Sequence, residues 1–120
     1  MIDLPKMFRS FRHAARGVVS VFRFENNARV HGPAAGVVIL LGVVLDISRA
    51  DWLWLLAAVA AVWITETINT AFEKLVDLVS PDYHPLAGQV KDLAAGAVLL
   101  AAIFAVLVGL LTLGPYLMEV

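Results

Sequence analysis

The chain has 120 residues, of which 61% are hydrophobic and only 16% are charged. Soluble domains are typically about half apolar and about a quarter charged, so this balance excludes an ordinary water-soluble domain and favours an integral membrane protein. The apolar excess excludes a disordered chain, and the absence of cysteine excludes disulfide scaffolds and thiolate sites. The length suits one domain, and the net charge of −1 excludes nothing by itself.

The first predicted element is an amphipathic helix over about residues 5–27. Its apolar side chains recur at spacings of three and four, and a stripe of arginines lies one position, or about 100°, round the helix. An aromatic face beside an arginine face favours a helix in the headgroup plane of a membrane. The alternative is an ordinary amphipathic helix packed on the rest of the protein. The two stripes are Phe8, Phe11, Ala15, Val18 and Phe22, and Arg9, Arg12, Arg16 and Arg23.

Three membrane-spanning helices follow, predicted over about residues 30–48, 52–79 and 88–118. The longest uncharged run, residues 93–118, has 26 residues, and about 20 suffice to cross the hydrocarbon core. Residues 52–72 contain a single charge, Glu66. The second range includes an extension beyond the membrane, and eight of the nine basic residues lie either in residues 1–31 or in the stretch 73–92 that joins the second and third spans. This distribution predicts that the N-terminus and both of these polar regions face the cytoplasm.

Polar side chains line one face of the second span near its far end. Glu66, Asn69, Thr70, Glu73 and Asp77 fall at positions i, i+3, i+4, i+7 and i+11, which aligns them on one face of a helix. A carboxylate at the edge of the hydrocarbon usually faces a protein interior or a cavity, because its desolvation is costly. We therefore predict functional roles for Glu66, as a general base, and for Glu73 with Asn69 between them. Asp77 fits better as a solvated residue on a helix that has left the membrane.

Two further polar clusters flank the spans. Lys91 and Asp92 stand at the start of the last span, where they either hold a phosphate or simply mark the membrane boundary. Glu25 and its polar neighbours either form a site or end the interfacial helix. No phosphate loop or dinucleotide fingerprint occurs in the sequence, and the three histidines have no metal-site spacing. Three spans form a thin bundle, so we expect a homo-oligomer with sites at subunit interfaces.

Three of these segments carry a family resemblance. Residues 66–77 read ETINTAFEKLVD and resemble the E-x-x-N-[ST]-A-[IF]-E-x-x-V-D signature of the prokaryotic diacylglycerol kinase and undecaprenol kinase family. Tyr83-His84 followed by KDLAAGAVL at residues 91–99 is similar to the second block of that family. ENNARVH at residues 25–31 is similar to the stretch before its first span. The resemblance covers nearly the whole chain, in order.

The resemblance implies an all-α homotrimeric membrane kinase with a surface helix and three spans in each subunit. Such enzymes transfer the γ-phosphoryl group of MgATP to the hydroxyl of a membrane lipid alcohol, and no nucleic acid takes part. It implies that Glu66 is the base on the lipid hydroxyl, supported by Asn69, and that Glu25 and Glu73 ligate Mg²⁺ and contact ATP. Further implied ATP contacts are Asp82, Tyr83, His84, Lys91 and Asp92. Lys6 and His13 depart from the residues that some members carry there.

The sequence leaves the substrate and one rival class open. The turn at residues 80–87, the block at 91–99 and His31 look closer to the undecaprenol kinase branch, so undecaprenol is the expected substrate and diacylglycerol the alternative. A small ion-coupled carrier would also place a carboxylate such as Glu66 in the membrane, and a structural subunit would tolerate its loss. A carrier needs access from both sides, whereas nearly all the charged clusters of this chain fall on one side.

Overall fold

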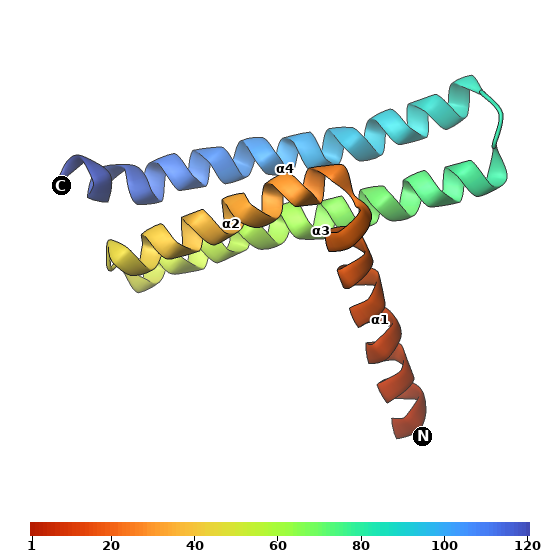
Figure 1. The fold of residues 1–120 in the computed structure, drawn as a ribbon, viewed down its shortest axis with the longest axis horizontal. Helices are drawn as coiled ribbons and strands as arrows, with labels where there is room; N and C mark the ends of the chain where they lie inside the picture. Colours follow the sequence, from red (N-terminus) through yellow and green to blue (C-terminus); the bar gives the residue numbers. More distant parts are fainter.

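The computed structural model describes residues 1–120 and contains four α-helices and no strands (Figure 1). They are α1 (Leu4–Phe24), α2 (Asn26–Val44), α3 (Arg49–Val79) and α4 (Pro85–Met118). The last three run side by side, and α1 is directed away from them (Figure 1). Each of α2, α3 and α4 is long and apolar enough to cross a membrane. The predicted all-α class with three candidate spans is therefore confirmed.

Local side-chain caps explain where three of the helices begin. The side chain of Asp3 accepts a hydrogen bond from the Lys6 backbone N–H at the start of α1, and Ser48 accepts one from Asp51 at the start of α3. His84 does the same for α4, where its Nδ1 accepts from the N–H of Leu86 at 3.1 Å. Each cap satisfies a backbone donor that the first turn of a helix leaves without a partner. α3 ends just before the Ser80-Pro81 step, where proline disfavours helical geometry in the residue before it.

The helix boundaries differ from the predicted ranges by a few residues. α1 ends at Phe24, three residues before the predicted position, because Glu25 adopts an extended conformation with φ −90° and ψ 129°. α2 therefore begins earlier, at Asn26, and it also ends earlier, at Val44. α4 begins at Pro85 rather than near residue 88. Hydrophobic periodicity does not locate a one-residue break inside a polar stretch, which is why residues 25–27 were assigned to the first helix.

The end of the bundle that carries the α2–α3 loop is closed by side-chain contacts. The Tyr116 hydroxyl donates to Asp51 Oδ2 at 2.8 Å and accepts from the Ser48 backbone N–H at 3.1 Å. On the facing side, a Cβ at Gly42 would lie only 2.7 Å from the ring of Trp52, so the glycine permits close packing of α2 on α3. We use the term loop-end cluster for the five residues that make these contacts: Gly42, Ser48, Asp51, Trp52 and Tyr116.

Most of the chain's surface remains uncovered within one subunit. Only 15 of the 120 residues are buried, and the accessible surface is 8905 Å². A compact soluble monomer of this mass would expose about 6,300 Å². The small core lies between α3 and α4 and holds Leu55, Ala58, Val108 and Leu113 together with Ile47 from the α2–α3 loop. The remaining apolar side chains face outward, as they do in a protein that is covered by lipid or by further copies of itself.

Candidate active site

Glu66 is the most deeply buried charged residue in the chain. Its side chain is 1% exposed on α3, and Oε2 has no hydrogen-bond partner. Asn69 and Thr70, one turn further along, are also buried, and Asn69 Oδ1 and Thr70 Oγ1 have no partner either. A span of about 20 residues counted from the start of α3 ends close to Asn69. By this count, the group of polar side chains is expected near one end of the span.

Charged side chains from three segments lie close to Glu66. Glu73 on α3, Glu25 at the break between α1 and α2, and His31 on α2 are all near enough for their charges to act on it. Asn69 Nδ2 donates to Glu73 Oε1 at 3.3 Å, and this bond orients the Glu73 carboxylate. The structure thus brings together the four residues predicted for catalysis and metal binding: Glu25, Glu66, Asn69 and Glu73.

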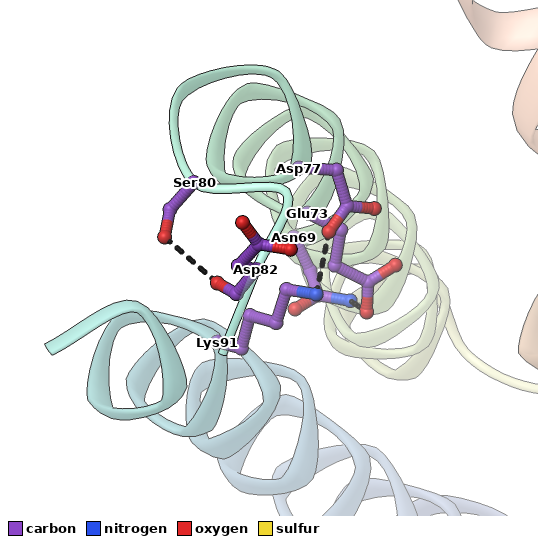
Figure 2. A network of polar contacts seen from close by, with 6 residues as sticks. All are labelled: Asn69, Glu73, Asp77, Ser80, Asp82 and Lys91. Atoms are coloured by element: carbon purple, nitrogen blue, oxygen red, sulfur yellow. Dashed lines mark hydrogen bonds and ion pairs between the residues drawn. The ribbon is translucent and has the colours of Figure 1, made fainter. Parts of the chain in front are cut away.

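A second polar cluster continues along α3 toward the α3–α4 loop, as Figure 2 shows. Lys91 on α4 reaches back to α3, and its Nζ lies 2.7 Å from Asp77 Oδ1. The Lys91 charge also interacts with Glu73, so the lysine links the two clusters. Both partners of the ion pair are partly exposed, with side-chain exposures of 43% and 66%, and such pairs are weak because water screens them. A stronger anion, such as a phosphate, can therefore compete with Asp77 for Lys91.

The other residues that are predicted to contact the nucleotide are all exposed. Asp82, Tyr83 and His84 form the α3–α4 loop, and Asp92 lies exposed on α4. The backbone oxygen of Asp82 accepts a bond from the Ser80 hydroxyl at 3.1 Å, which folds the loop back on itself (Figure 2). The His84 ring caps α4 instead of reaching toward Glu66. The structure does not bring these four side chains into contact with the Glu66 group.

The carboxylates fit a metal ion that is bound jointly with a phosphate. No group of three His, Cys, Asp or Glu side chains is arranged to hold a metal by itself. Mg²⁺ is usually held by one or two carboxylates while waters and substrate phosphates complete its shell. Glu25 and Glu73, both near Glu66, supply two hard oxygen donors of that kind. Lys6 and His13 lie exposed on α1, well before the Glu25 break in the chain.

Known proteins are similar to this sequence over most of its length. The prokaryotic diacylglycerol kinase family matches residues 12–113 of the chain. The chain belongs to that family. Its relatives include an undecaprenol kinase from Bacillus subtilis (strain 168), which is 37% identical over 115 residues that cover 96% of this chain and 94% of the relative.

Two relatives carry the other family name. A diacylglycerol kinase from Synechocystis sp. is 42% identical over 116 residues, covering 96% of this chain and 66% of the relative. A diacylglycerol kinase from Escherichia coli (strain K12) is 41% identical over 76 residues, covering 60% and 62% of the two chains. As a member of the prokaryotic diacylglycerol kinase family, the protein is a membrane lipid kinase that uses ATP. The predicted enzyme class is therefore confirmed.

Two features of this family member's site were not predicted from its sequence. His31 was noted only for its motif, yet its buried Nδ1 lacks a partner beside Glu66. Phe22 and Trp63 were given no joint role, yet their rings stack next to the site with centroids 4.1 Å apart. Phe22 belongs to the amphipathic stripe of α1, but neither the spacing nor the composition of the chain indicates which residue it would contact 41 positions later.

Proposed function

We propose that this chain transfers the γ-phosphoryl group of MgATP to the hydroxyl of undecaprenol, giving undecaprenyl phosphate. The observation that carries the proposal is the buried Glu66 carboxylate, which lies beside two further carboxylates and whose Oε2 has no partner. An unpaired buried acceptor costs stability unless a ligand completes it. A lipid hydroxyl, whose apolar chain stays in the membrane, supplies the missing donor.

In this mechanism, Glu66 takes the proton of the lipid hydroxyl as the oxygen attacks the γ-phosphorus. The new oxygen–phosphorus bond forms while the bond between the γ-phosphorus and the bridging oxygen breaks, and ADP leaves. Asn69 positions Glu73 through the bond between their side chains. Phosphoryl transfer depends mainly on alignment and on neutralising charge, so a site of a few fixed side chains suffices for it.

The nucleotide side of the proposed site uses the remaining polar residues. Glu25 and Glu73 would hold Mg²⁺, which supplies neutralisation of the phosphate charge when bound. Lys91 would release Asp77 and bind a phosphate oxygen instead, because its ion pair with Asp77 is exposed. Asp92 and the exposed α3–α4 loop, with Asp82, Tyr83 and His84, would complete the nucleotide contacts. ATP is cytoplasmic, so the site and the N-terminus would face the cytoplasm of the bacterial inner membrane.

We further propose that the active protein is a homotrimer with sites shared between subunits. The extra accessible surface and the small core support association, because three spans leave most apolar side chains uncovered. The side chains of Lys91 and Asp77 in the second cluster (Figure 2) are also partly exposed within one subunit. A neighbouring subunit would close the site and exclude water from the transferring phosphoryl group.

Undecaprenol is favoured over diacylglycerol by one observation. The relative named undecaprenol kinase matches over almost the full length of both chains, at 96% and 94%. A cavity of about 450 Å³ between α2, α3 and α4 is lined mainly by apolar side chains, and His31 is the one titratable residue among them. Such walls suit the apolar part of either lipid, so the cavity supports a lipid substrate without separating the two candidates. Because other relatives are named diacylglycerol kinases, diacylglycerol is the second candidate substrate.

The test is phosphate transfer from labelled MgATP in mixed detergent–lipid micelles. Undecaprenol and diacylglycerol are offered separately and then in competition, with Mg²⁺ present and with Mg²⁺ chelated. The proposal predicts Mg²⁺-dependent transfer with preference for undecaprenol. A preference for diacylglycerol would overturn the substrate assignment while leaving the mechanism intact. Transfer to neither lipid by folded protein would overturn both.

A further inference from the structure

An aromatic pair joins the surface helix to the bundle next to the candidate active site. The rings of Phe22 on α1 and Trp63 on α3 stack with centroids 4.1 Å apart and an interplanar angle of 19°. Gly32 on α2 completes the junction, because a Cβ there would lie 3.4 Å from the Phe22 ring and 3.8 Å from Trp63. Three helices therefore meet at one point, and stacked aromatic pairs of this kind add attraction beyond the burial of their area.

The position of this pair relates it directly to two site carboxylates. Phe22 precedes Glu25 by three residues, and Trp63 precedes Glu66 by three. Three residues of a helix rise about 4.5 Å, so each ring lies about one turn from a carboxylate on its own segment. The charges of Glu25 and Glu66 are near enough to interact. The stack therefore joins the two segments immediately beside the point where they must meet.

Little else attaches α1 to the bundle. Every residue from Met1 to Val19 is exposed, and Val21 is the one buried side chain of α1. Arg29 on α2 donates from Nη2 to the Arg23 carbonyl at 3.0 Å, which braces the break between α1 and α2. That bond fixes α1 relative to α2 but not relative to α3. The stack, next to the buried Val21, supplies a direct side-chain link between the helix that ends at Glu25 and the helix that carries Glu66.

We propose that Phe22 and Trp63 are a positioning pair that sets the separation of Glu25 and Glu66. This inference rests on the proposed function, which assigns Mg²⁺ binding to Glu25 and the role of base to Glu66. Neither ring touches the reacting atoms. Their contact holds α1 on α3, so that the Glu25 carboxylate faces the same space as the Glu66 carboxylate when MgATP and the lipid hydroxyl are aligned. Losing the contact leaves both carboxylates present but lets Glu25 move away.

The test compares Phe22→Leu and Trp63→Leu, which keep an apolar side chain but remove the stack, with two matched controls. Phe11→Leu removes an exposed aromatic ring from α1, and Trp54→Leu removes one from α3. We expect both stack variants to lose about 10- to 100-fold in kcat, because misplacement of aligned groups acts on the rate. KM for the lipid should stay unchanged in Phe22→Leu. Trp63 also lines the apolar cavity, so Trp63→Leu is compared through its kcat and its Mg²⁺ requirement. The saturating Mg²⁺ concentration should rise. Phe22→Trp, which restores an aromatic ring, should recover most of the kcat.

A second readout does not depend on activity. The chain contains no cysteine, so spin labels can be attached to two cysteines introduced at Ala15 on α1 and Leu75 on α3, with labelled protein diluted in unlabelled protein. We expect one narrow distance distribution in the parent chain and in the controls, and a broad one in both stack variants. Distances that stay narrow in the stack variants would overturn the proposal. Broadened distances with unchanged kcat and Mg²⁺ requirement would also overturn it, because α1 would then be released from α3 without consequence for the site.

The same experiment separates this proposal from the proposed function. If the parent chain phosphorylates no lipid, the proposed function fails, whatever the labels show. If the parent chain is active and Glu66→Gln is inactive, the proposed function stands, and the stack variants then decide the positioning role alone. Circular dichroism and the elution volume of each variant confirm that lost activity does not come from lost folding.

Discussion

The loop-end cluster and the region around Glu66 differ in whether their polar side chains have hydrogen-bond partners. In the loop-end cluster, the Tyr116 hydroxyl pairs with both Asp51 and the Ser48 N–H. Around Glu66, about midway along α3, buried polar atoms of His31, Glu66, Asn69 and Thr70 have no partner within the subunit. Buried polar groups in folded proteins are nearly always paired, and exceptions concentrate where a ligand binds. We therefore propose that the loop-end cluster contributes stability and the Glu66 region contributes chemistry, and substitutions in each region test this proposal.

The largest expected effect comes from Glu66→Gln. The amide keeps the shape of the side chain but does not accept the hydroxyl proton, so we expect kcat to fall by about 10²- to 10⁴-fold. The stability should hold or rise slightly, because the buried charge disappears. Labelled phosphate transfer and thermal unfolding in detergent measure the two quantities. Activity above a tenth of the parent value would contradict the role assigned to Glu66.

Gly42→Ala should give the largest loss of stability. Its Cβ would lie 2.7 Å and 2.9 Å from two Trp52 ring atoms, so the ring or α2 must shift. Overpacking of this kind costs about 1–3 kcal/mol. Gly36→Ala on the same helix is the matched control, because nothing lies within 4 Å of a Cβ there. Equal unfolding midpoints for the two variants would show that the loop end is not packed as described.

Tyr116→Phe should lower stability by a smaller amount. It removes a donor to Asp51 and an acceptor from the Ser48 N–H, and the loss of such bonds costs about 1–2 kcal/mol when partners are left partly buried. Specific activity of the folded enzyme should not change, because the cluster lies at the end away from Glu66. Tyr83→Phe, at an exposed residue, serves as the stability control. A fall in kcat for folded Tyr116→Phe would contradict the division of roles between the two regions.

Asp77→Asn should have the smallest effect. It frees Lys91 from an exposed ion pair, so we expect the melting temperature to stay unchanged and KM for ATP to fall slightly at low salt. Lys91→Met, by contrast, should raise KM for ATP, because a phosphate loses its cation. Both differences should shrink as salt screens the charges. Unchanged KM for ATP in Lys91→Met would remove Lys91 from the nucleotide site.

The sequence predicted the features that depend on local spacing. The all-α class and the three candidate spans follow from runs of apolar residues, and the structure contains them. The separation of three and four residues along α3 placed Glu66, Asn69 and Glu73 on one face, and the structure buries the first two and joins the last two. Asp77 was expected to be solvated, and it is exposed, although it pairs with Lys91.

The features that the sequence did not predict depend on contacts between distant residues. Tyr116 bonds to residues 65 and 68 positions away, and Phe22 stacks on a ring in another helix. Hydrophobic periodicity reports which face of a helix is apolar but not which residue it meets. The His84 cap was missed for a different reason, because a histidine beside a proline reads equally well as a ligand or as a turn residue. The roles of the nucleotide-contact residues remain proposals.

The most direct measurement determines activity and stability on the same samples for one substitution at Glu66 and one in the loop-end cluster. Glu66→Gln and Tyr116→Phe are purified in parallel, and each is assayed for transfer from labelled MgATP to undecaprenol and for its unfolding midpoint. The predicted result is a crossed pattern, in which Glu66→Gln is stable but inactive and Tyr116→Phe is less stable but fully active while folded. A Glu66→Gln enzyme that still phosphorylates undecaprenol would contradict the account.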